Sequence, residues 1–453
     1  MTDLSALSDA VGAEDLLTDP AAMEAYRRDW AKDPGVGMPC AVLRVRSAEQ
    51  VVAAMRWATA TRTPVVPRGA GSGLSGGSSA VDGALTLSLD RMTGIDIDVA
   101  TRTARVEPGA LNIDVKRAAA ARGLWYPPDP SSYEICSIGG NLATNAGGLC
   151  CVKYGVTTDY VLGLDVVLAD GRLLRLGGPQ LKDVAGLSLM KLFVGSEGTL
   201  GIITGATLRL VPAPPPAATM VASFATVADA AGSVVAMCAR LRASMLELMD
   251  NASVNAVEDL RSMGLDRSAG ALLIAQSDVP GEARIDEVEL MGQVCRDHGA
   301  LEVFTTDDPD EGELFTAARR AAFPAIERRG SLLLEDVGVA VPLLPRLLEG
   351  IATIAARLEV DIPVVAHAGD GNTHPIIVYD AADPVSAAHA NEAFSEVMAL
   401  AISLGGTITG EHGVGRLKKA ALPAQLGEDV MAVSRAIKGA LDPLGLMNPG
   451  AVL

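Results

Sequence analysis

Arg68-Gly-Ala-Gly-Ser-Gly-Leu-Ser-Gly-Gly77 is a glycine-rich loop between two predicted strands, at 63–67 and 85–89. Its five glycines in ten positions let the backbone adopt positive φ and bring N–H groups close to a ligand. A pyrophosphate suits such a loop. A flexible linker is the alternative, but linkers are rarely flanked by strands. The loop lacks the Gly-Lys-Ser/Thr of a P-loop and does not lead into an amphipathic helix, as a Rossmann fingerprint does.

Two further Gly-rich segments follow this loop. Residues 137–148 read Ser-Ile-Gly-Gly-Asn-Leu-Ala-Thr-Asn-Ala-Gly-Gly, and residues 193–203 read Phe-Val-Gly-Ser-Glu-Gly-Thr-Leu-Gly-Ile-Ile. Several such backbone surfaces in one domain fit a long phosphate-bearing cofactor better than a mononucleotide. The run Pro212-Ala-Pro-Pro-Pro216 excludes ladder pairing and marks the end of this domain.

A different chemical signal lies at 364–378, Val-Val-Ala-His-Ala-Gly-Asp-Gly-Asn-Thr-His-Pro-Ile-Ile-Val. Two apolar runs flank a polar turn, which predicts two strands joined by a tight loop. The chain reverses between His367 and His374, so both imidazoles can face one point. We expect these histidines and Glu411 to hold a divalent metal, Zn²⁺ first and Mn²⁺ or Fe²⁺ as alternatives. The other interpretation makes the histidines hydrogen-bonding turn residues.

Composition restricts the class of protein. The 453 residues are 49% hydrophobic and 20% charged, which is typical of a globular chain of two or three domains. A net charge of −18 and 3% aromatic residues argue against nucleic acid and anionic membranes. No apolar run reaches the about 18 residues of a spanning helix, and the first residues lack a secretion signal. We expect a cytoplasmic protein, peripheral at a membrane only through a partner.

Cysteine spacing and helix signals complete the outline. The six cysteines form no C-x-x-C pair, so zinc fingers and iron–sulfur clusters have no support. Residues 14–30 are predicted to form a first helix, with Asp19 as its cap and Pro20 in its first turn. After Pro216, predicted strands and helices alternate, which indicates an α+β sheet with helices on one face.

Together these motifs resemble FAD-linked oxidases of the vanillyl-alcohol oxidase/para-cresol methylhydroxylase (PCMH) fold. Within them, the chain is similar to the D-2-hydroxyacid dehydrogenase branch, which includes the glycolate oxidase catalytic subunit, D-lactate dehydrogenase and D-2-hydroxyglutarate dehydrogenase. The resemblance implies an α+β fold in four parts. These are a helical segment at 1–37, a two-subdomain FAD-binding PCMH-type domain at 38–215, an α+β substrate or cap domain with an antiparallel sheet and the metal site at 216–404, and a C-terminal segment at 405–453 that returns to the flavin.

The resemblance also implies FAD, held non-covalently because Ser72 stands where covalent relatives carry a histidine. The residues it assigns to FAD are Arg68, Gly69, Ala70, Gly71, Ser72, Gly73, Leu74 and Ser75 at the pyrophosphate; Ser131, Ser137, Gly140, Asn141, Thr144, Asn145 and Gly148 along the flavin and ribityl chain; Glu197, Gly198, Thr199 and Ile202 on the adenosine side; and Asn448 near the flavin ring.

The implied reaction oxidises a short D-2-hydroxy acid, of the D-lactate or glycolate type, to the 2-oxo acid. The substrate's hydroxyl and carboxylate would chelate the metal, which lowers the hydroxyl pKa. His412 would take the proton as general base, and the C2 hydride would pass to flavin N5. Arg319 matches the family segment that binds the substrate carboxylate. Asp370 and Asn372 in the turn could orient the histidines.

Other readings stay open. The 2-hydroxyglutarate enzymes carry a lysine for the distal carboxylate, whereas residues 334–337 read Leu-Glu-Asp-Val, so a D-2-hydroxyglutarate-type activity is the alternative. A metal-dependent hydrolase would leave the Gly-rich segments unexplained, and a non-catalytic FAD-binding subunit would leave the His/His/Glu-His set unexplained. The electron acceptor is expected to be a quinone, a cytochrome, an electron-transfer flavoprotein or a partner subunit, and not NAD or oxygen. A homodimer is possible. Lys418, Lys419, His298 and His389 are expected at the surface.

Overall fold

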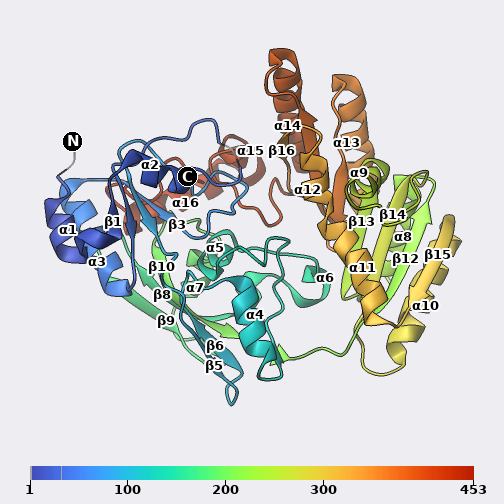
Figure 1. Cartoon of the computed structure of the whole chain (residues 1–453), viewed down its shortest axis with the longest axis horizontal. Coiled ribbons are helices and arrows are strands. Elements are labelled where there is room, and N and C mark those ends of the chain that lie inside the picture. Colours follow the sequence, from blue (N-terminus) through green and yellow to red (C-terminus); the bar gives the residue numbers. More distant parts are fainter. Residues whose placement is uncertain (1–2, 32) are drawn as a thin grey trace. The chain divides into compact units, whose positions relative to one another are not determined.

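The computed structural model describes residues 3–31 and 33–453, and its contacts divide the chain into two compact units. Unit 1 comprises Met1–Gly147, Val156–Ala213 and Glu411–Leu453, and unit 2 comprises Gly148–Gly155 and Pro214–Gly410. Both units mix helices with strands (Figure 1). The expected α+β class is therefore confirmed.

The first sheet of unit 1 carries the glycine-rich loop. Its β3 and β2 both run parallel to β4, and β1 pairs antiparallel with β2. Apolar side chains of α3 pack on this sheet, and Ser47 caps α3 by accepting a hydrogen bond from the Gln50 N–H (3.4 Å). The elements are β1 (Leu16–Leu17), β2 (Ala41–Arg44), β4 (Leu85–Ser88), β3 (Val65–Arg68), α1 (Ser5–Val11) and α3 (Ala48–Thr61).

The second sheet of unit 1 is antiparallel, in the order β5-β6-β10-β8-β9. Its helices cover a separate apolar core. The elements are β5 (Ile95–Asp98), β6 (Thr103–Val106), β10 (Ile202–Arg209), β8 (Val161–Val167), β9 (Leu173–Gly177), α4 (Asn112–Ala120), α5 (Ile138–Thr144), η3 (Thr157–Tyr160), α7 (Met190–Phe193) and the small pair β7 (Leu124–Trp125) and β11 (Val211–Pro212).

The prediction of one helix over 14–30 is wrong. The chain there forms η1 (Ala13–Asp15), then β1, then α2 (Pro20–Met23) and η2 (Glu24–Tyr26). The two leucines of β1 pair with β2 and interrupt the helix. Asp19 does cap α2, because its side chain accepts a hydrogen bond from the Ala22 N–H (3.2 Å) and Pro20 opens the first turn.

Residues 411–453 complete the first sheet of unit 1. They contain η5 (Lys419–Ala421), α15 (Leu422–Leu426) and α16 (Glu428–Leu441). The Val65 N–H donates to the Leu446 carbonyl (2.8 Å), and the Asn448 N–H donates to the Val65 carbonyl (2.8 Å). Met447 lies in the same apolar core as Val65. Both ends of the chain therefore contribute to one sheet.

Unit 2 is organised on a large antiparallel sheet in the order β15-β12-β14-β13-β18-β19-β16, with β17 paired to β19. The strands are β15 (Ala300–Thr306), β12 (Ala218–Phe224), β14 (Ala271–Ser277), β13 (Met245–Asp250), β18 (Val364–His367), β19 (Asn372–Tyr379), β16 (Ser331–Leu334) and β17 (Val337–Gly338). The other elements are α6 (Cys151–Tyr154), α8 (Val227–Cys238), α9 (Asn251–Arg261), α10 (Ala283–Asp297), α11 (Pro309–Arg320), α12 (Ala322–Glu327), η4 (Val341–Leu343), α13 (Leu344–Leu358) and α14 (Pro384–Ser403).

Helices cover both faces of this sheet, so the expectation of helices on one face is wrong. Successive strand residues point to opposite faces. Val221 packs with Ala318 of α11 and Ile326 of α12 in one apolar core. Its neighbour Met220 contacts Cys295 of α10 on the other face (3.9 Å between the sulfur atoms). The helices on both sides are visible in Figure 1.

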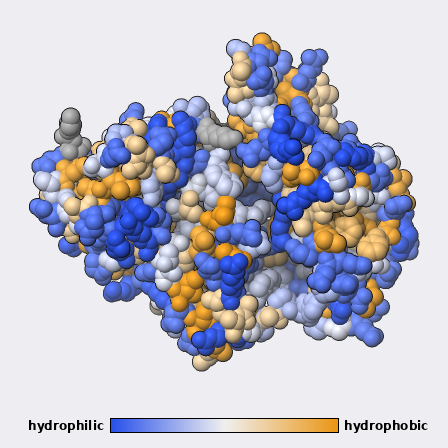
Figure 2. Space-filling model, viewed as in Figure 1, coloured by the Kyte–Doolittle hydropathy of each residue, from blue (hydrophilic) through white to orange (hydrophobic). Residues whose placement is uncertain are grey.

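The visible surface is mostly hydrophilic, with apolar residues in small scattered groups (Figure 2). Within the part of the chain that the structure describes, no helix combines the length and the apolar character needed to cross a membrane.

Candidate functional site

The loop from Gly69 to Gly77 offers an unusual row of backbone donors in unit 1. Among the described residues, none accepts a hydrogen bond from the backbone N–H groups of Gly71 to Gly77. Gly71 and Gly76 have φ of +76° and +78°, which favours glycine. Consecutive backbone N–H groups are what a phosphate needs, so the loop fits the pyrophosphate of a dinucleotide such as FAD.

Arg68 supports this loop through protein contacts. Its guanidinium is buried and donates to the carbonyl groups of Arg28 (2.8 Å) and Ser78 (3.3 Å). Burial lowers the pKa of the Arg68 side chain. The observed partners of Arg68 are thus carbonyl groups that fix the shape of the loop, while the loop amides remain for a phosphate.

The second Gly-rich segment lies directly against the first. Ser137 caps α5, and its hydroxyl oxygen accepts hydrogen bonds from the N–H groups of Ala70 (3.2 Å) and Gly140 (3.3 Å). A Cβ at Gly69 would lie 2.4 Å from the Ser137 hydroxyl oxygen, so only glycine fits there. Asn141 is buried and accepts from the Asn112 side chain (3.0 Å). These contacts hold two of the predicted FAD segments together.

The remaining residues predicted to bind FAD differ in their surroundings. Ser131 is exposed, Thr144 donates to the Gly140 carbonyl (3.2 Å), and Asn145 accepts from the Thr158 N–H (2.9 Å). Gly148 belongs to unit 2. Three other residues predicted to bind FAD are buried within unit 1, namely Gly198, Thr199 and Ile202.

Glu197 and Asn448, both predicted at the cofactor, hold other parts of unit 1. The Glu197 carboxylate accepts hydrogen bonds from the N–H groups of Val414 (2.7 Å) and Gly415 (2.9 Å). Burial raises its pKa to about 7, against the opposing effect of these bonds. The Asn448 amide donates to the carbonyl groups of Gly77 (2.8 Å) and Glu197 (2.7 Å). Their side chains connect the glycine-rich loop to residues 411–453.

Lys418 is not at the surface, so that prediction is wrong. Only 1% of it is exposed, and its N–H donates to the Val414 carbonyl (3.1 Å) in a tight turn. Its positive charge acts to lower the pKa of Glu197. The neighbouring Lys419 is half-buried and donates to the backbone carbonyl of Leu453. Val414 and Lys418, which follow the Glu411-His412 pair, are therefore buried in the interior of unit 1.

The predicted histidine hairpin is present in unit 2 as β18 and β19. Val365 pairs with His374, and His367 pairs with Asn372. Both imidazoles are buried, with ring centroids 5.0 Å apart and planes 85° apart. Gly371 in the turn has φ of +81°, and a Cβ there would lie 2.1 Å from the Val339 carbonyl oxygen. The turn thus requires glycine and brings the two rings together.

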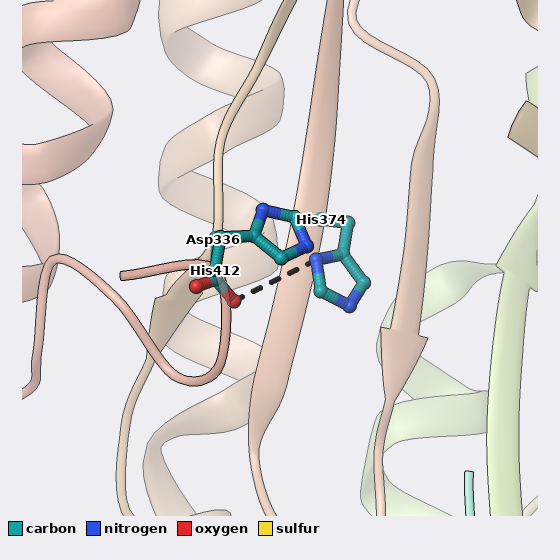
Figure 3. Close-up of side chains that lie close together, drawn as sticks. All are labelled: Asp336, His374 and His412. Carbon is teal, nitrogen blue, oxygen red and sulfur yellow. Dashed lines mark ion pairs between the residues drawn. The ribbon is translucent and has the colours of Figure 1, made fainter. Parts of the chain in front are cut away.

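Glu411 and His412 follow directly on Gly410, whose N–H donates to the Asp336 carbonyl (3.1 Å). Ligand atoms of His367, His374 and Glu411 all lie within 4.8 Å of one another. The same holds for Asp336, His374 and His412, which Figure 3 shows with the ion pair between Asp336 and His374. Two imidazoles and carboxylates at this spacing are a donor set that fits Zn²⁺.

Glu247, a residue that the sequence did not single out, joins His367 to Arg319. Its carboxylate lies 2.8 Å from Nδ1 of His367 and 2.8 Å from Nε of Arg319, and its side chain is 0% exposed. Met245, Glu247 and Met249 point to one face of β13, the face on which α11 packs. An acidic residue inside an apolar strand was a signal that could have drawn attention to it, because buried charges are almost always paired.

Arg319 comes from the last turn of α11 and is 4% exposed. Beyond its contact with Glu247, its buried Nη2 has no hydrogen-bond acceptor among the described residues. A buried guanidinium with an unused donor is suited to a carboxylate from outside the protein. The next residue, Arg320, instead pairs with Glu313 (2.9 Å).

Carboxylates outside the turn face the two histidines. Asp336 lies 3.7 Å from Nδ1 of His374 and accepts a hydrogen bond from the Thr409 hydroxyl (2.7 Å). Asp370 is exposed, and its carboxylate accepts from the Asn372 N–H within the turn (3.2 Å). The orienting contact to His367 therefore comes from Glu247, and Asp336 faces His374.

Comparisons with known proteins agree with both halves of this description. Residues 39–177 match a FAD binding domain, and residues 213–452 match the C-terminal domain of FAD linked oxidases. The chain is 40% identical to the glycolate oxidase subunit GlcD of Bacillus subtilis, over 91% of this chain and 88% of the relative. It is 34% identical to D-2-hydroxyglutarate dehydrogenase of Xanthomonas citri pv. viticola (99% and 97%) and 32% identical to D-lactate dehydrogenase of Archaeoglobus fulgidus (95% and 96%).

Among solved structures, p-cresol methylhydroxylase with bound substrate has the same fold. The TM-score is 0.83 at 17% sequence identity, over 99% of this chain and 96% of the other. The expected PCMH-type fold is therefore confirmed. By its matching domains and by these relatives, the chain belongs to the family of FAD-linked oxidases.

Proposed function

We propose that the protein oxidises a short D-2-hydroxy acid, of the D-lactate or glycolate type, to the 2-oxo acid, with non-covalent FAD and a divalent metal. The observation that supports it most is the group formed by His367, His374 and Glu411 next to the Glu247–Arg319 pair. A 2-hydroxy acid carries a hydroxyl beside a carboxylate. The metal ligands would act on the hydroxyl through a bound ion, and the guanidinium of Arg319 would bind the carboxylate. The names of the relatives agree with this substrate class.

FAD would be held by the amides of the glycine-rich loop, by the second Gly-rich segment at 137–148, and by Gly198, Thr199 and Ile202 of the third segment. When bound, it would accept the C2 hydride at N5 and so supply the redox chemistry. In this chain Ser137 fixes the contact between Ala70 and Gly140, and Arg68 fixes the far side of the loop. These residues fix the shape of the phosphate site before the cofactor binds, so the site is preorganised.

His367, His374 and Glu411 would hold the metal, with Zn²⁺ as the preferred ion. Since Nδ1 of His367 contacts the Glu247 carboxylate, this nitrogen carries the proton and Nε2 is the ligand atom. A bound divalent ion would supply Lewis acidity that lowers the pKa of the substrate hydroxyl. Glu247 keeps the ring of His367 in a single orientation and stabilises its ligand tautomer.

Arg319 would bind the substrate carboxylate. Glu247 forms an ion pair with its Nε, and the buried Nη2, which has no acceptor among the described residues, would donate to the substrate. Arginine is suited to this task because its planar donors match the geometry of a carboxylate. His412 would act as general base for the hydroxyl proton, since an imidazole accepts a proton near neutral pH. Its position in the chain, next to Glu411, supports this role.

Two buried carboxylates favour a substrate with one carboxylate. Glu335 and Asp336 are both 0% exposed at the end of β16, where the 2-hydroxyglutarate enzymes are expected to carry a lysine. A second substrate carboxylate near acidic side chains would lose solvation and be repelled. Glycolate and D-lactate have no second carboxylate, which makes them the preferred candidates over D-2-hydroxyglutarate.

The test is anaerobic flavin reduction by a panel of glycolate, D-lactate, L-lactate and D-2-hydroxyglutarate. The purified protein should be yellow and contain zinc, and D-lactate or glycolate should bleach the flavin bands. His374→Ala should lose zinc and the bleaching while keeping FAD. His389→Ala, a change on the partly exposed α14, is the matched control and should behave as wild type. A colourless protein, or bleaching that survives in His374→Ala, would contradict the proposal.

A further inference from the structure

The segment that follows His412 is held by a buried carboxylate of unit 1. Both oxygens of Glu197 are used, one by the Val414 N–H (2.7 Å) and one by the Gly415 N–H (2.9 Å), and the side chain is 7% exposed. A Cβ at Gly413 would lie 2.8 Å from the carboxylate, so the loop closes around it only with glycine at this position. The glycines after Glu411-His412 are thus explained by a carboxylate distant in sequence.

Glu197 is itself fixed from several directions. Its N–H donates to the Ala143 carbonyl (2.8 Å), and its carbonyl accepts from the Asn448 side chain (2.7 Å). Its φ is +49°, a conformation that L residues rarely adopt without support from their surroundings. The carboxylate therefore cannot follow the 413–415 segment if that segment moves, and it acts as a fixed anchor.

His412 also has an anchor of its own in the glycine-rich loop. The Ser75 hydroxyl donates to the His412 carbonyl (3.2 Å), and the Ser75 carbonyl accepts from the Arg416 N–H (2.9 Å). Ser75 and Glu197 thus hold the backbone on both sides of Gly413. Two anchors at this spacing fix the direction in which the His412 side chain leaves the backbone.

We propose that Glu197 is a positioning residue for His412, acting through the Val414 and Gly415 N–H groups, and not a contact to FAD. This inference rests on the proposed role of His412 as general base. A general base must stay within hydrogen-bond reach of the proton it accepts, and small displacements are costly in rate. Hydrogen bonds from backbone N–H groups to an ionised carboxylate are about twice as strong as those to a neutral acceptor. Two such bonds therefore hold this segment firmly.

The charge of Glu197 should appear in the pH dependence. Burial and the nearby Asp29 raise its pKa to about 7, while the two N–H groups and Lys418 act in the opposite direction. Protonation converts one carboxylate oxygen into an O–H group, which competes with its role as acceptor. The deprotonated form of Glu197 is the one that accepts both N–H groups, so activity should decrease as the pH falls through about 7.

The test compares Glu197→Gln with Ser196→Ala. Ser196 is the adjacent residue, and its hydroxyl donates only to the Phe193 carbonyl in its own turn (2.7 Å) among the described residues. In Glu197→Gln the peptide covering 410–418 should exchange amide hydrogens faster, and kcat should fall about tenfold or more. FAD content and KM should stay unchanged, and the part of the activity decrease at acid pH that comes from protonation of Glu197 should be lost. Ser196→Ala should match wild type in all five measurements.

Several results would overturn the inference. Loss of FAD with an unchanged kcat per bound flavin would show that Glu197 serves the cofactor. Unchanged exchange in 410–418 would show that it does not hold the loop. If Glu197→Gln fails to fold, Glu197→Asp decides, since the shorter carboxylate should give the same faster exchange, and wild-type exchange would contradict the inference. If no hydroxy acid reduces the wild-type flavin, the proposed function fails, while the exchange measurement still tests the anchor by itself.

Discussion

Replacing Glu247 by glutamine should weaken metal binding at the histidine hairpin while leaving unit 2 folded. The carboxylate contacts Nδ1 of His367 and Nε of Arg319, each at 2.8 Å, in a fully buried position. A neutral amide of the same size can still accept from one partner, but it no longer balances the guanidinium charge or raises the basicity of the imidazole. Loss of such an orienting carboxylate lowers metal affinity about 10–100-fold.

The same change should lower the free energy of unfolding of the metal-free protein. Removing one partner of a buried ion pair costs about 3–5 kcal/mol, and Arg319 keeps its charge in the variant. The two quantities are measured separately, by competition with a zinc chelator and by urea unfolding after metal removal. FAD content should not change, because Glu247 lies in unit 2 and the glycine-rich loop lies in unit 1.

Glu258→Gln is the matched control. Glu258 is also buried in unit 2, on α9, but its carboxylate accepts from the Leu265 N–H (2.8 Å). This control should lose some stability and keep its zinc affinity. If Glu247→Gln binds zinc as tightly as wild type, Glu247 does not orient a metal ligand. If both variants lose zinc to the same extent, general loosening of unit 2 is the cause.

Two further predictions concern binding and pH. Arg319→Lys should raise KM for a 2-hydroxy acid about tenfold or more by losing the planar donors, whereas Arg320→Lys, whose partner is Glu313, should leave KM unchanged in steady-state assays; equal effects would contradict the role of Arg319. Burial raises the pKa of Asp250 to about 6 from its ordinary 3.8, against hydrogen bonds from Ser253 and Val364. Because the folded state holds this proton more tightly than the unfolded state, the contribution of Asp250 to stability falls as pH rises from 4 through 6, by up to about 3 kcal/mol. The free energy of unfolding in urea, measured for wild type minus that for Asp250→Asn, should therefore fall over this range. A value that does not change with pH would contradict the prediction.

Features made by residues close in sequence were predictable. The hairpin from Val364 to Tyr379 follows from two apolar runs around a Gly/Asp/Asn turn, and β18 and β19 are where the pattern placed them. The glycine-rich loop between β3 and β4 follows in the same way. In both cases the signal and the structure it predicts lie within about twenty residues, so local backbone chemistry is sufficient.

Features made by strand register were not predictable. Glu247 reaches His367 because β13 pairs with β18 in the register Leu248 to Ala366, and nothing local in either strand specifies that neighbour. The same applies to Asp336, which approaches His374 from the segment between β16 and β17. The sequence instead suggested Asp370, which is near His374 along the chain but exposed.

Lys418 shows a different limit of sequence reasoning. Two adjacent lysines after a polar motif are ordinarily solvated, because burying an ammonium group is costly. Here a nearby buried carboxylate, Glu197, makes the interior less unfavourable for a cation. Glu197 and Lys418 lie more than two hundred residues apart in the sequence, so the residues around Lys418 do not indicate that a carboxylate is nearby.

The closure of the first sheet of unit 1 by residues 446–448 has a consequence for the order of synthesis. Val65 is translated early, but its partners Leu446 and Asn448 emerge only after all of Pro214–Gly410. Unit 2 can therefore finish folding on the ribosome while unit 1 still has an open sheet edge. Truncation before Leu446 would remove both backbone partners of Val65, so this edge of the first sheet should then be cut faster by proteases.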